Sequence, residues 1–308
     1  MEIIAKINKI FREIILRKPT QVVLEPTNRC NLNCPYCMVG MQGELVSKYG
    51  VASHSFMTRP KGLMDDKVFY SVLDNLKKFG IKKVYLHFQG EPFLNPLTPN
   101  FAKVLKKNRF WVGIFTNGMA FNNSNVKEIA DAEVDLIRFS VDGASKETYE
   151  KNRLGGDFNR VYESMKKVVL AHKGKKTRIE WQFLVIRNNE HEIEKARGLA
   201  KDIGIHFFLK GFRETDPNLV TTIKTYRAVF LKKPCRDIYH QIGIYWNGDV
   251  VPCCYDVDGK EIMGNLLNNS LQQIWDSQRY RDFRKRVNNA VRIPEDEPEI
   301  CKTCLRWK

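Results

Sequence analysis

Residues 30–37 read CNLNCPYC and place three cysteines, Cys30, Cys34 and Cys37, on one short stretch. The stretch directly follows residues 21–25 (QVVLE), an apolar run that predicts the first β-strand. Three thiolates on one loop can wrap one face of a cubane cluster, because cluster irons are held by cysteine sulfur. Three ligands for four irons leave one iron open. Structural zinc, the competing interpretation, normally takes four protein ligands in a closed tetrahedron.

Strands and helices alternate on both sides of this loop. An amphipathic helix is expected over residues 2–17. Strands are expected over 21–25, 83–88, 111–116, 135–141, 178–185 and 205–210, with helices over 64–79, 98–108, 123–132, 157–173 and 189–203. Six strands with helical crossovers predict an α/β fold with a parallel sheet. Right-handed crossovers curl such a sheet into a partial barrel, with its chemistry at the carboxyl ends of the strands.

One face of these strands is polar, whereas a parallel strand covered on both sides reads as apolar throughout. Polar side chains occupy alternate positions of the strands, in step with the residues that lead into the strand-end loops. They are Glu25, His87, Gln89, Arg138, Ser140, Glu180 and Gln182. This pattern predicts a barrel interior that holds a ligand. A structural ion pair between Arg138 and Glu180 is the alternative for those two residues.

The CNLNCPYC stretch, with the aromatic Tyr36 before its third cysteine, resembles the signature of radical S-adenosylmethionine (SAM) enzymes. The resemblance implies that the open iron chelates the amino and carboxylate groups of SAM. Reductive cleavage then gives methionine and a 5′-deoxyadenosyl radical, which takes hydrogen from an unactivated carbon. The protein's part would be binding, orientation and exclusion of water. The fold implied is a partial (βα)6 radical SAM barrel.

Loops after successive strands match the same family more weakly. Residues 89–92 (QGEP) resemble its glycine–glutamate motif, which meets the SAM amino group, with Gln89 in place of the commoner glycine. Residues 116–118 (TNG) and 140–143 (SVDG) end the next two strands, although such sequences also form ordinary turns. The resemblance places Ser140 and Arg153 near the ribose and carboxylate of SAM. The expected cofactor contacts are Tyr36, Gln89, Gly90, Glu91, Asn117, Ser140, Asp142, Arg153 and Gln182.

Five further cysteines lie near the C-terminal end, in segments that include residues 248–254 (GDVVPCC) and 301–304 (CKTC). Together with residues 264–275 (GNLLNNSLQQIW), these resemble the SPASM or twitch extension of radical SAM maturases, which binds auxiliary clusters. A full SPASM domain carries two clusters, but five thiols suffice for one four-cysteine [4Fe–4S] cluster and a spare. The resemblance assigns the ligands as Cys235, Cys253, Cys301 and Cys304. Ligation by Cys254 in place of Cys253, and structural zinc, remain alternatives.

The spare thiol, Cys254, points away from its neighbour Cys253, because successive side chains in an extended segment alternate. A thiol S–H bond is weak enough to donate hydrogen to a carbon radical. We therefore expect Cys254 to be catalytic as a hydrogen donor, which would make the enzyme an epimerase. The alternative is a small buried hydrophobe, the usual role of a free cysteine. A hairpin over residues 241–253, turning at Asn247-Gly248, and a helix over 270–287 are expected around these cysteines.

Composition limits the remaining choices. The 308 residues carry 51 Lys and Arg against 35 Asp and Glu, a net charge of +16 that is spread along helices. Dispersed charge of this kind favours a solvated basic surface, so no nucleic-acid partner is expected. No apolar run reaches the ~20 residues of a membrane span, and no signal peptide is evident. A cytoplasmic chain with eight cysteines favours metal ligation over disulfides.

The expected organisation is an N-terminal helix (1–18), a radical SAM barrel (19–212) and a small α+β auxiliary-cluster domain (213–308). About 20 residues precede the first strand, too few for a leader-recognition domain. The hypothesis is therefore an enzyme that oxidises or epimerises a small or carbohydrate-like substrate, with a flavodoxin- or ferredoxin-type electron donor. Alternatives are a radical SAM maturase of peptides or proteins, and a non-catalytic Fe–S or zinc protein that binds nucleic acid.

Overall fold

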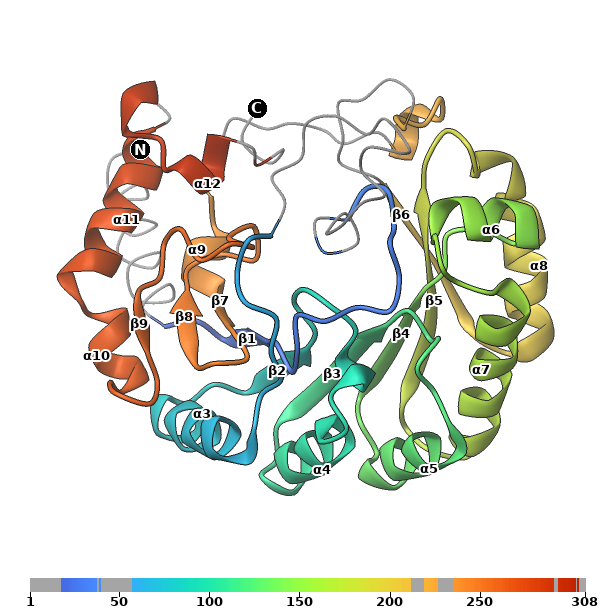
Figure 1. Ribbon diagram of the computed structural model, residues 1–308, viewed down its shortest axis with the longest axis horizontal. Helices are drawn as coiled ribbons and strands as arrows, with labels where there is room; N and C mark the ends of the chain where they lie inside the picture. The colour runs from blue at the N-terminus through green and yellow to red at the C-terminus, as the bar shows by residue number, and fades with distance from the viewer. Residues whose placement is uncertain are drawn as a thin grey trace, which may run out of the picture.

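The computed structural model describes residues 18–37, 39, 57–211, 219–226, 235–290, 293–302 and 304. The helix expected over 2–17 lies outside these residues, as does most of segment 38–61. One nine-stranded sheet runs through the molecule in the order β6-β5-β4-β3-β2-β1-β7-β8-β9. Figure 1 shows the sheet curving around a concave side, with β6 and β9 at its two edges. The partial barrel expected from the sequence is confirmed.

The first six strands are parallel, and each lies where the sequence predicts it. They are β1 (Gln21–Leu24), β2 (Lys83–Leu86), β3 (Trp111–Thr116), β4 (Leu136–Ser140), β5 (Arg178–Val185) and β6 (His206–Gly211). The crossover helices are α3 (Asp66–Phe79), α4 (Thr98–Lys107), α5 (Asn123–Ala132), α7 (Phe158–Ala171) and α8 (Ile193–Ile203). They cover the convex face of the sheet (Figure 1). A short helix missed by sequence reasoning, α6 (Lys146–Asn152), follows β4.

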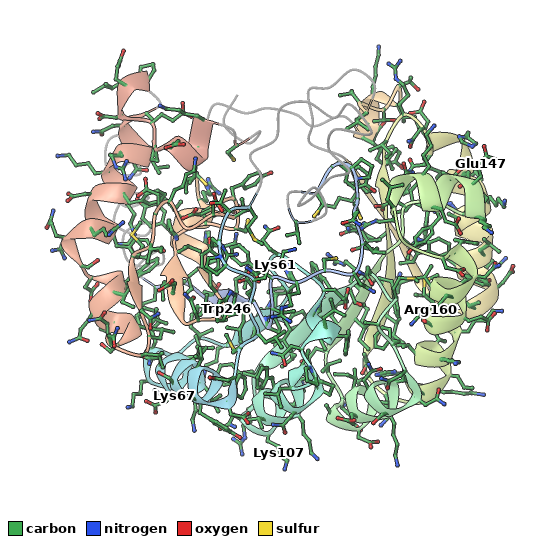
Figure 2. All side chains as sticks on the ribbon, viewed as in Figure 1. Lys61, Lys67, Lys107, Glu147, Arg160 and Trp246 are labelled. Atoms are coloured by element: carbon green, nitrogen blue, oxygen red, sulfur yellow. The ribbon has the colours of Figure 1, made fainter. Side chains whose placement is uncertain are left out.

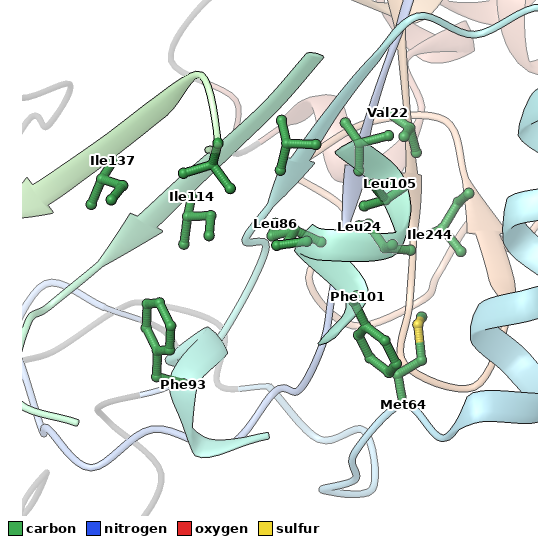
Figure 3. Packing of buried hydrophobic residues seen from close by; sticks show 14 of the residues in the cluster. Val22, Leu24, Met64, Leu86, Phe93, Phe101, Leu105, Ile114, Ile137 and Ile244 are labelled. Carbon is green, nitrogen blue, oxygen red and sulfur yellow. The ribbon is translucent and has the colours of Figure 1, made fainter. Parts of the chain in front are cut away.

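The convex face of the sheet carries the hydrophobic core. Leu24, Leu86, Ile114 and Ile137 are fully buried on neighbouring strands and form one cluster with Phe101 of α4 (Figure 3). Burying each such side chain stabilises the folded state by about 1.5–3 kcal/mol relative to leaving it exposed. Side chains alternate along a strand. Because these residues pack on the convex face, the residues between them must lie on the concave face.

The C-terminal part extends the same sheet. Strand β7 (Gln241–Ile244) pairs in parallel with β1, so Gln241 lies beside Gln21. The expected hairpin is present: β8 (Asp249–Val251) pairs antiparallel with β7 after a turn at Gly248, whose φ is 89°. Strand β9 (Gly264–Asn265) completes the sheet.

Helices α9 (Asp237–His240), α10 (Leu271–Trp275), α11 (Gln278–Asn289) and α12 (Glu299–Lys302) surround these last strands. The prediction of a single helix over 270–287 is wrong. The segment forms two helices, because the Ser277 side chain accepts a hydrogen bond from the Tyr280 backbone amide and so caps the start of α11. Within the described part of the chain, no helix is long and apolar enough to cross a membrane.

Candidate active site

The first cysteine cluster lies on the loop after β1, at the carboxyl ends of the strands. Cys34 is buried, and the Cys37 amide donates to the Cys34 carbonyl oxygen at 3.0 Å, which folds the loop back on itself. The Cys30 thiol interacts electrostatically with those of Cys34 and Cys37. The structure thus brings the three predicted ligands together on one short turn.

Two side chains donate hydrogen bonds toward these sulfurs. Asn117 Nδ2 lies 3.8 Å from Cys30 Sγ, and Arg153 Nη1 lies 3.8 Å from Cys34 Sγ. Burial raises the pKa of Cys30 to about 12 and that of Cys34 to about 11. Both thiols are therefore protonated at neutral pH unless a metal holds them as thiolates, so cluster binding must release protons.

Asp142 is the centre of a buried polar network beneath this loop. Its Oδ2 accepts from Arg153 Nε at 2.7 Å and from the Tyr36 hydroxyl at 2.7 Å, while Oδ1 accepts from the Leu184 amide at 2.9 Å. Both carboxylate oxygens are thus engaged by protein donors. Asp142 and Tyr36, predicted as cofactor contacts, lie where they can fix the cysteine loop and the Arg153 guanidinium.

Glu91 joins the loops that follow β2 and β3. It is buried, and its carboxylate accepts from the Thr116 hydroxyl and the Asn117 amide, both at 2.7 Å. Burial raises the pKa of Glu91 to about 7, an effect that these hydrogen bonds oppose. The glycine–glutamate segment therefore positions Asn117, which in turn contacts Cys30.

Gly90 is required by its close approach to the cysteine loop. Its φ is 84°, and a Cβ there would lie 2.5 Å from the Arg29 carbonyl oxygen. Replacing Gly90 with alanine is expected to cost about 2 kcal/mol in the free energy of unfolding and to displace the loop that carries Cys30. Chemical denaturation and the iron content after anaerobic reconstitution measure both effects.

Gly174 provides the matched control for this prediction. Its φ is 80°, but nothing lies within 4 Å of a Cβ built there. The Gly174→Ala variant should therefore lose only the cost of the backbone conformation, about 1 kcal/mol, and keep its iron. Equal losses of iron in the two variants would show that the contact with Arg29 is unimportant.

The remaining predicted contacts lie at the rim of the barrel interior. Ser140 ends β4 beside Gln182 of β5. The backbone N–H of Gln89 donates a hydrogen bond to the Glu25 carboxylate. Gln182 is 7% exposed, and its Oε1 has no hydrogen-bond partner among the described residues. An acceptor left unsatisfied and buried is costly, so this atom fits a ligand that carries an N–H or O–H donor.

The second group of cysteines gathers beneath the hairpin. The Cys235 thiol interacts electrostatically with both Cys253 and Cys301, and Cys304 with Cys301. The expectation that Cys254 points away from Cys253 is wrong, because the two side chains are hydrogen-bonded, but Cys254 also has contacts outside this group. Its sulfur is 3.5 Å from Gln241 Nε2 of β7 and interacts electrostatically with Lys210 of β6, besides its neighbour Cys253.

The spacing of the cysteines bears on the choice between zinc and a cluster. In the described part of the chain, no three Cys, His, Asp or Glu side chains stand close enough to hold a single metal ion. A zinc site with Zn–S bonds of about 2.3 Å needs its sulfurs drawn around one point. A cubane binds each cysteine through a different iron, so its ligands stand farther apart. Donor sets made of cysteine thiols alone fit Fe–S clusters, and zinc accepts such sets as well.

One buried ion pair joins the two cysteine-bearing parts of the chain. Glu25 is fully buried after β1, and its Oε1 and Oε2 accept from Arg59 Nη1 at 3.1 Å and Nη2 at 2.8 Å. Arg59 also stacks on the Tyr245 ring at 3.5 Å and donates to the Val257 carbonyl oxygen at 2.7 Å. Sequence reasoning left Arg59 unassigned, although a carboxylate closing an apolar strand signals that a buried partner exists.

Comparison with known proteins identifies the class. Residues 24–200 match the family model of the radical SAM superfamily, and residues 235–305 match that of the SPASM iron–sulfur cluster-binding domain. The chain therefore belongs to the radical SAM superfamily. It is a radical SAM enzyme, so the alternative of a non-catalytic protein that binds nucleic acid is wrong.

Three similar proteins illustrate the range of this family. The tungsten-containing aldehyde ferredoxin oxidoreductase cofactor-modifying protein of Pyrococcus furiosus is 25% identical over 316 residues, covering 87% of this chain and 84% of the relative. The PqqA peptide cyclase of Gluconobacter oxydans is 24% identical over 325 residues, with 94% and 83% covered. SuiB of Streptococcus suis, solved with bound S-adenosylmethionine, shares the fold with a TM-score of 0.70 at 15% identity, covering 97% of this chain and 74% of SuiB.

The cofactors of this enzyme are SAM and [4Fe–4S] clusters, as the sequence predicted. When bound, they supply reductive cleavage of SAM and removal of hydrogen from a substrate carbon. The chain's own residues supply the rest. Asn117 and Arg153 donate toward cysteine sulfur, and Glu91 and Asp142 hold those two donors in place.

Proposed function

We propose that this radical SAM enzyme oxidises or epimerises a small or carbohydrate-like substrate, with Cys254 as the hydrogen donor. The supporting observation is the different surroundings of the two adjacent thiols, which are hydrogen-bonded to each other. Cys253 interacts with Cys235, whereas Cys254 lies beside Gln241 and interacts with Lys210. Those two residues belong to β7 and β6, the strands that bound the parallel part of the sheet. The contacts of Cys254 with both strands support its assignment as the thiol that meets the substrate.

The proposed step inverts a carbon centre. The Cys254 S–H bond gives its hydrogen atom to a substrate carbon radical, on the face opposite the one that lost hydrogen. The sulfur is left one electron and one proton short, and a flavodoxin- or ferredoxin-type donor supplies the electron while solvent supplies the proton. A substrate radical that instead passes an electron to an oxidised Fe–S cluster of the enzyme and a proton to solvent would give a dehydrogenated product.

Solvent deuterium tests this proposal. The holoenzyme is incubated in D2O with SAM, reductant and a panel of polyols, amino sugars and sugar phosphates. An epimerase gives an inverted product that has gained one deuterium, because the thiol proton exchanges with solvent, whereas a dehydrogenase gives a product that has lost two hydrogens. Formation of 5′-deoxyadenosine without either product across the panel would count against this substrate class.

Paired cysteine variants test the assignment of the two thiols. Cys254→Ala is expected to keep about eight irons per chain and lose inversion, whereas Cys253→Ala should lose about four irons. Iron analysis after anaerobic reconstitution distinguishes them. The opposite result, with iron lost from Cys254→Ala alone, would make Cys254 the ligand and remove it as the donor.

Peptide modification is the second candidate function. The PqqA peptide cyclase matches 94% of this chain, and SuiB has been solved bound to the precursor peptide SuiA. Both likenesses favour a substrate presented within a peptide. A peptide library in the same D2O assay separates the two functions, since only a maturase would give a modified peptide.

A further inference from the structure

A layer of interior side chains lies directly below the proposed SAM site. In the sheet register, Phe115 of β3 pairs with Arg138 of β4, which pairs with Glu180 of β5. Each lies two residues before Asn117, Ser140 and Gln182, the predicted cofactor contacts on the same strands. Since alternate residues of a strand share a face, this layer is the next surface that a molecule in the barrel meets.

Arg138 is held in a fixed position within this layer. Its Nε donates to Glu180 Oε2 at 2.6 Å, and its guanidinium lies 4.5 Å from the Phe115 ring and 4.9 Å from the Phe208 ring. The ion pair with Glu180, the alternative to a ligand-binding role for these two residues, is present. Among the described residues, the terminal nitrogens of Arg138 make no hydrogen bond. A guanidinium fixed between two rings is preorganised to bind an oxyanion with those nitrogens.

The interior is richer in cations than in carboxylates. Glu180 is shared by Arg138 and Arg178, whose Nε lies 2.5 Å from Oε1. A single carboxylate cannot neutralise two guanidiniums, and Glu25, which follows β1, is paired with Arg59. The described concave-side positions of β2 to β6 carry four cations and one carboxylate: Lys83, Arg138, Arg178, Lys210 and Glu180. Lys83 and Arg178 are exposed and screened by solvent, so the attraction on an anion inside the barrel comes from Arg138 and, more weakly because it is exposed as well, from Lys210.

Two aromatic side chains complete the surface. Phe208 is 38% exposed although it lies on the concave side of β6, so it offers apolar area to a bound molecule. The His87 ring stacks on Phe115 at 4.3 Å, and its nitrogens make no hydrogen bond with described residues. Burial, with Lys210 and Arg138 nearby, lowers the pKa of His87 to about 3. The imidazole is therefore neutral and can exchange hydrogen bonds with a hydroxyl or amine.

We propose that the substrate carries an oxyanion, a carboxylate or phosphate, and that Arg138 and Lys210 bind it against Phe208. The inference rests on the proposed function, because it names the substrate class of the same barrel. It makes Arg138 a residue that determines specificity: neutral polyols and amino sugars are excluded in favour of acidic or phosphorylated ones.

Anion binding by the reconstituted, SAM-loaded holoenzyme tests this inference without a known substrate. Calorimetric titrations at low ionic strength use inorganic phosphate in one arm and acetate in the other. Arg138→Gln is expected to weaken binding at least about tenfold, since a hydrogen bond to a charged group is lost. Glu180→Gln should strengthen binding several-fold, because it removes the carboxylate that competes for Arg138. If the site binds one of the two anions more tightly, that preference shows whether the substrate's oxyanion is a phosphate or a carboxylate.

Two control variants keep the result interpretable. Arg160→Gln removes an exposed arginine in the first turn of α7 (labelled in Figure 2) and should bind as the wild type does. Arg138→Lys keeps the charge but loses the planar pair of donors, so it should recover only part of the affinity. Iron content and the unfolding transition verify that each variant folds.

Two outcomes overturn the inference: Arg138→Gln binding phosphate and acetate as the wild type does, or Glu180→Gln binding no more tightly. Failure of the proposed function is seen separately, as a wild-type enzyme that gives neither inverted nor dehydrogenated product from neutral or anionic compounds. Binding of the inorganic anions does not depend on that turnover, so the two failures remain distinguishable.

Discussion

Replacing Cys34 with alanine is expected to abolish cleavage of SAM, lowering 5′-deoxyadenosine formation at least about a thousandfold. Cys34 is buried on the turn that also carries Cys37, and Arg153 donates toward its sulfur. With two cysteines left on the loop, the SAM-binding cluster loses one of its three predicted ligands. Quantifying deoxyadenosine and iron in the anaerobically reconstituted variant measures the loss, and iron should fall to about half of the wild-type content.

Cys301→Ala is the matched control for Cys34→Ala. It removes a cysteine from the second group and should also lose about half of the iron, but it leaves the SAM site intact. The two variants would then share an iron content and differ in what SAM cleavage remains. Undiminished deoxyadenosine from Cys34→Ala would show that the first cluster does not depend on this cysteine.

Removing the Arg59 side chain is expected to lower the free energy of unfolding by about 3 to 5 kcal/mol, because it leaves the Glu25 carboxylate buried without its cationic partner. The effect depends on pH. Burial already raises the pKa of Glu25, and loss of Arg59 raises it further. The folded state then holds a proton that the unfolded state releases above its pKa of about 4.3, so stability falls as pH rises through the folded pKa. Denaturation of Arg59→Met at acidic and alkaline pH measures this.

The double variant Glu25→Gln/Arg59→Met separates the charge from the packing. A neutral amide removes the buried charge, so the double variant should be more stable than Arg59→Met and lose the pH dependence. What it still lacks is the contact of Arg59 with Tyr245 and Val257. A double variant as unstable as the single one would show that these contacts, and not the ion pair, join the two parts.

Local pattern was enough to predict most of the barrel. Apolar runs placed β1 to β6, and their period of two put Arg138, Glu180 and Gln182 on the concave side where the structure has them. The pairing of β7 with β1 could not be predicted from the sequence, because no local pattern indicates the register that places Gln241 beside Gln21. Ser277, by contrast, is a capping residue whose position in the sequence already marked the break between α10 and α11.

The site was predictable as a set of residues but not as a network. Motifs named Asp142 and Glu91, whereas their roles as acceptors for Arg153 and Asn117 depend on loops from different strands meeting at one edge. The ion pair of Glu25 with Arg59 spans 34 positions into a segment without periodicity. Such contacts follow from tertiary packing, which a one-dimensional pattern does not encode.

Anaerobic reconstitution is the measurement that bears most directly on this enzyme. The protein is loaded with iron and sulfide, its iron is counted, and SAM and dithionite are added before 5′-deoxyadenosine is quantified. We expect about eight irons per chain, two [4Fe–4S] clusters, with deoxyadenosine formed. About four irons with deoxyadenosine would reassign the C-terminal cysteines to zinc. Fully loaded protein that forms no deoxyadenosine would contradict the central claim.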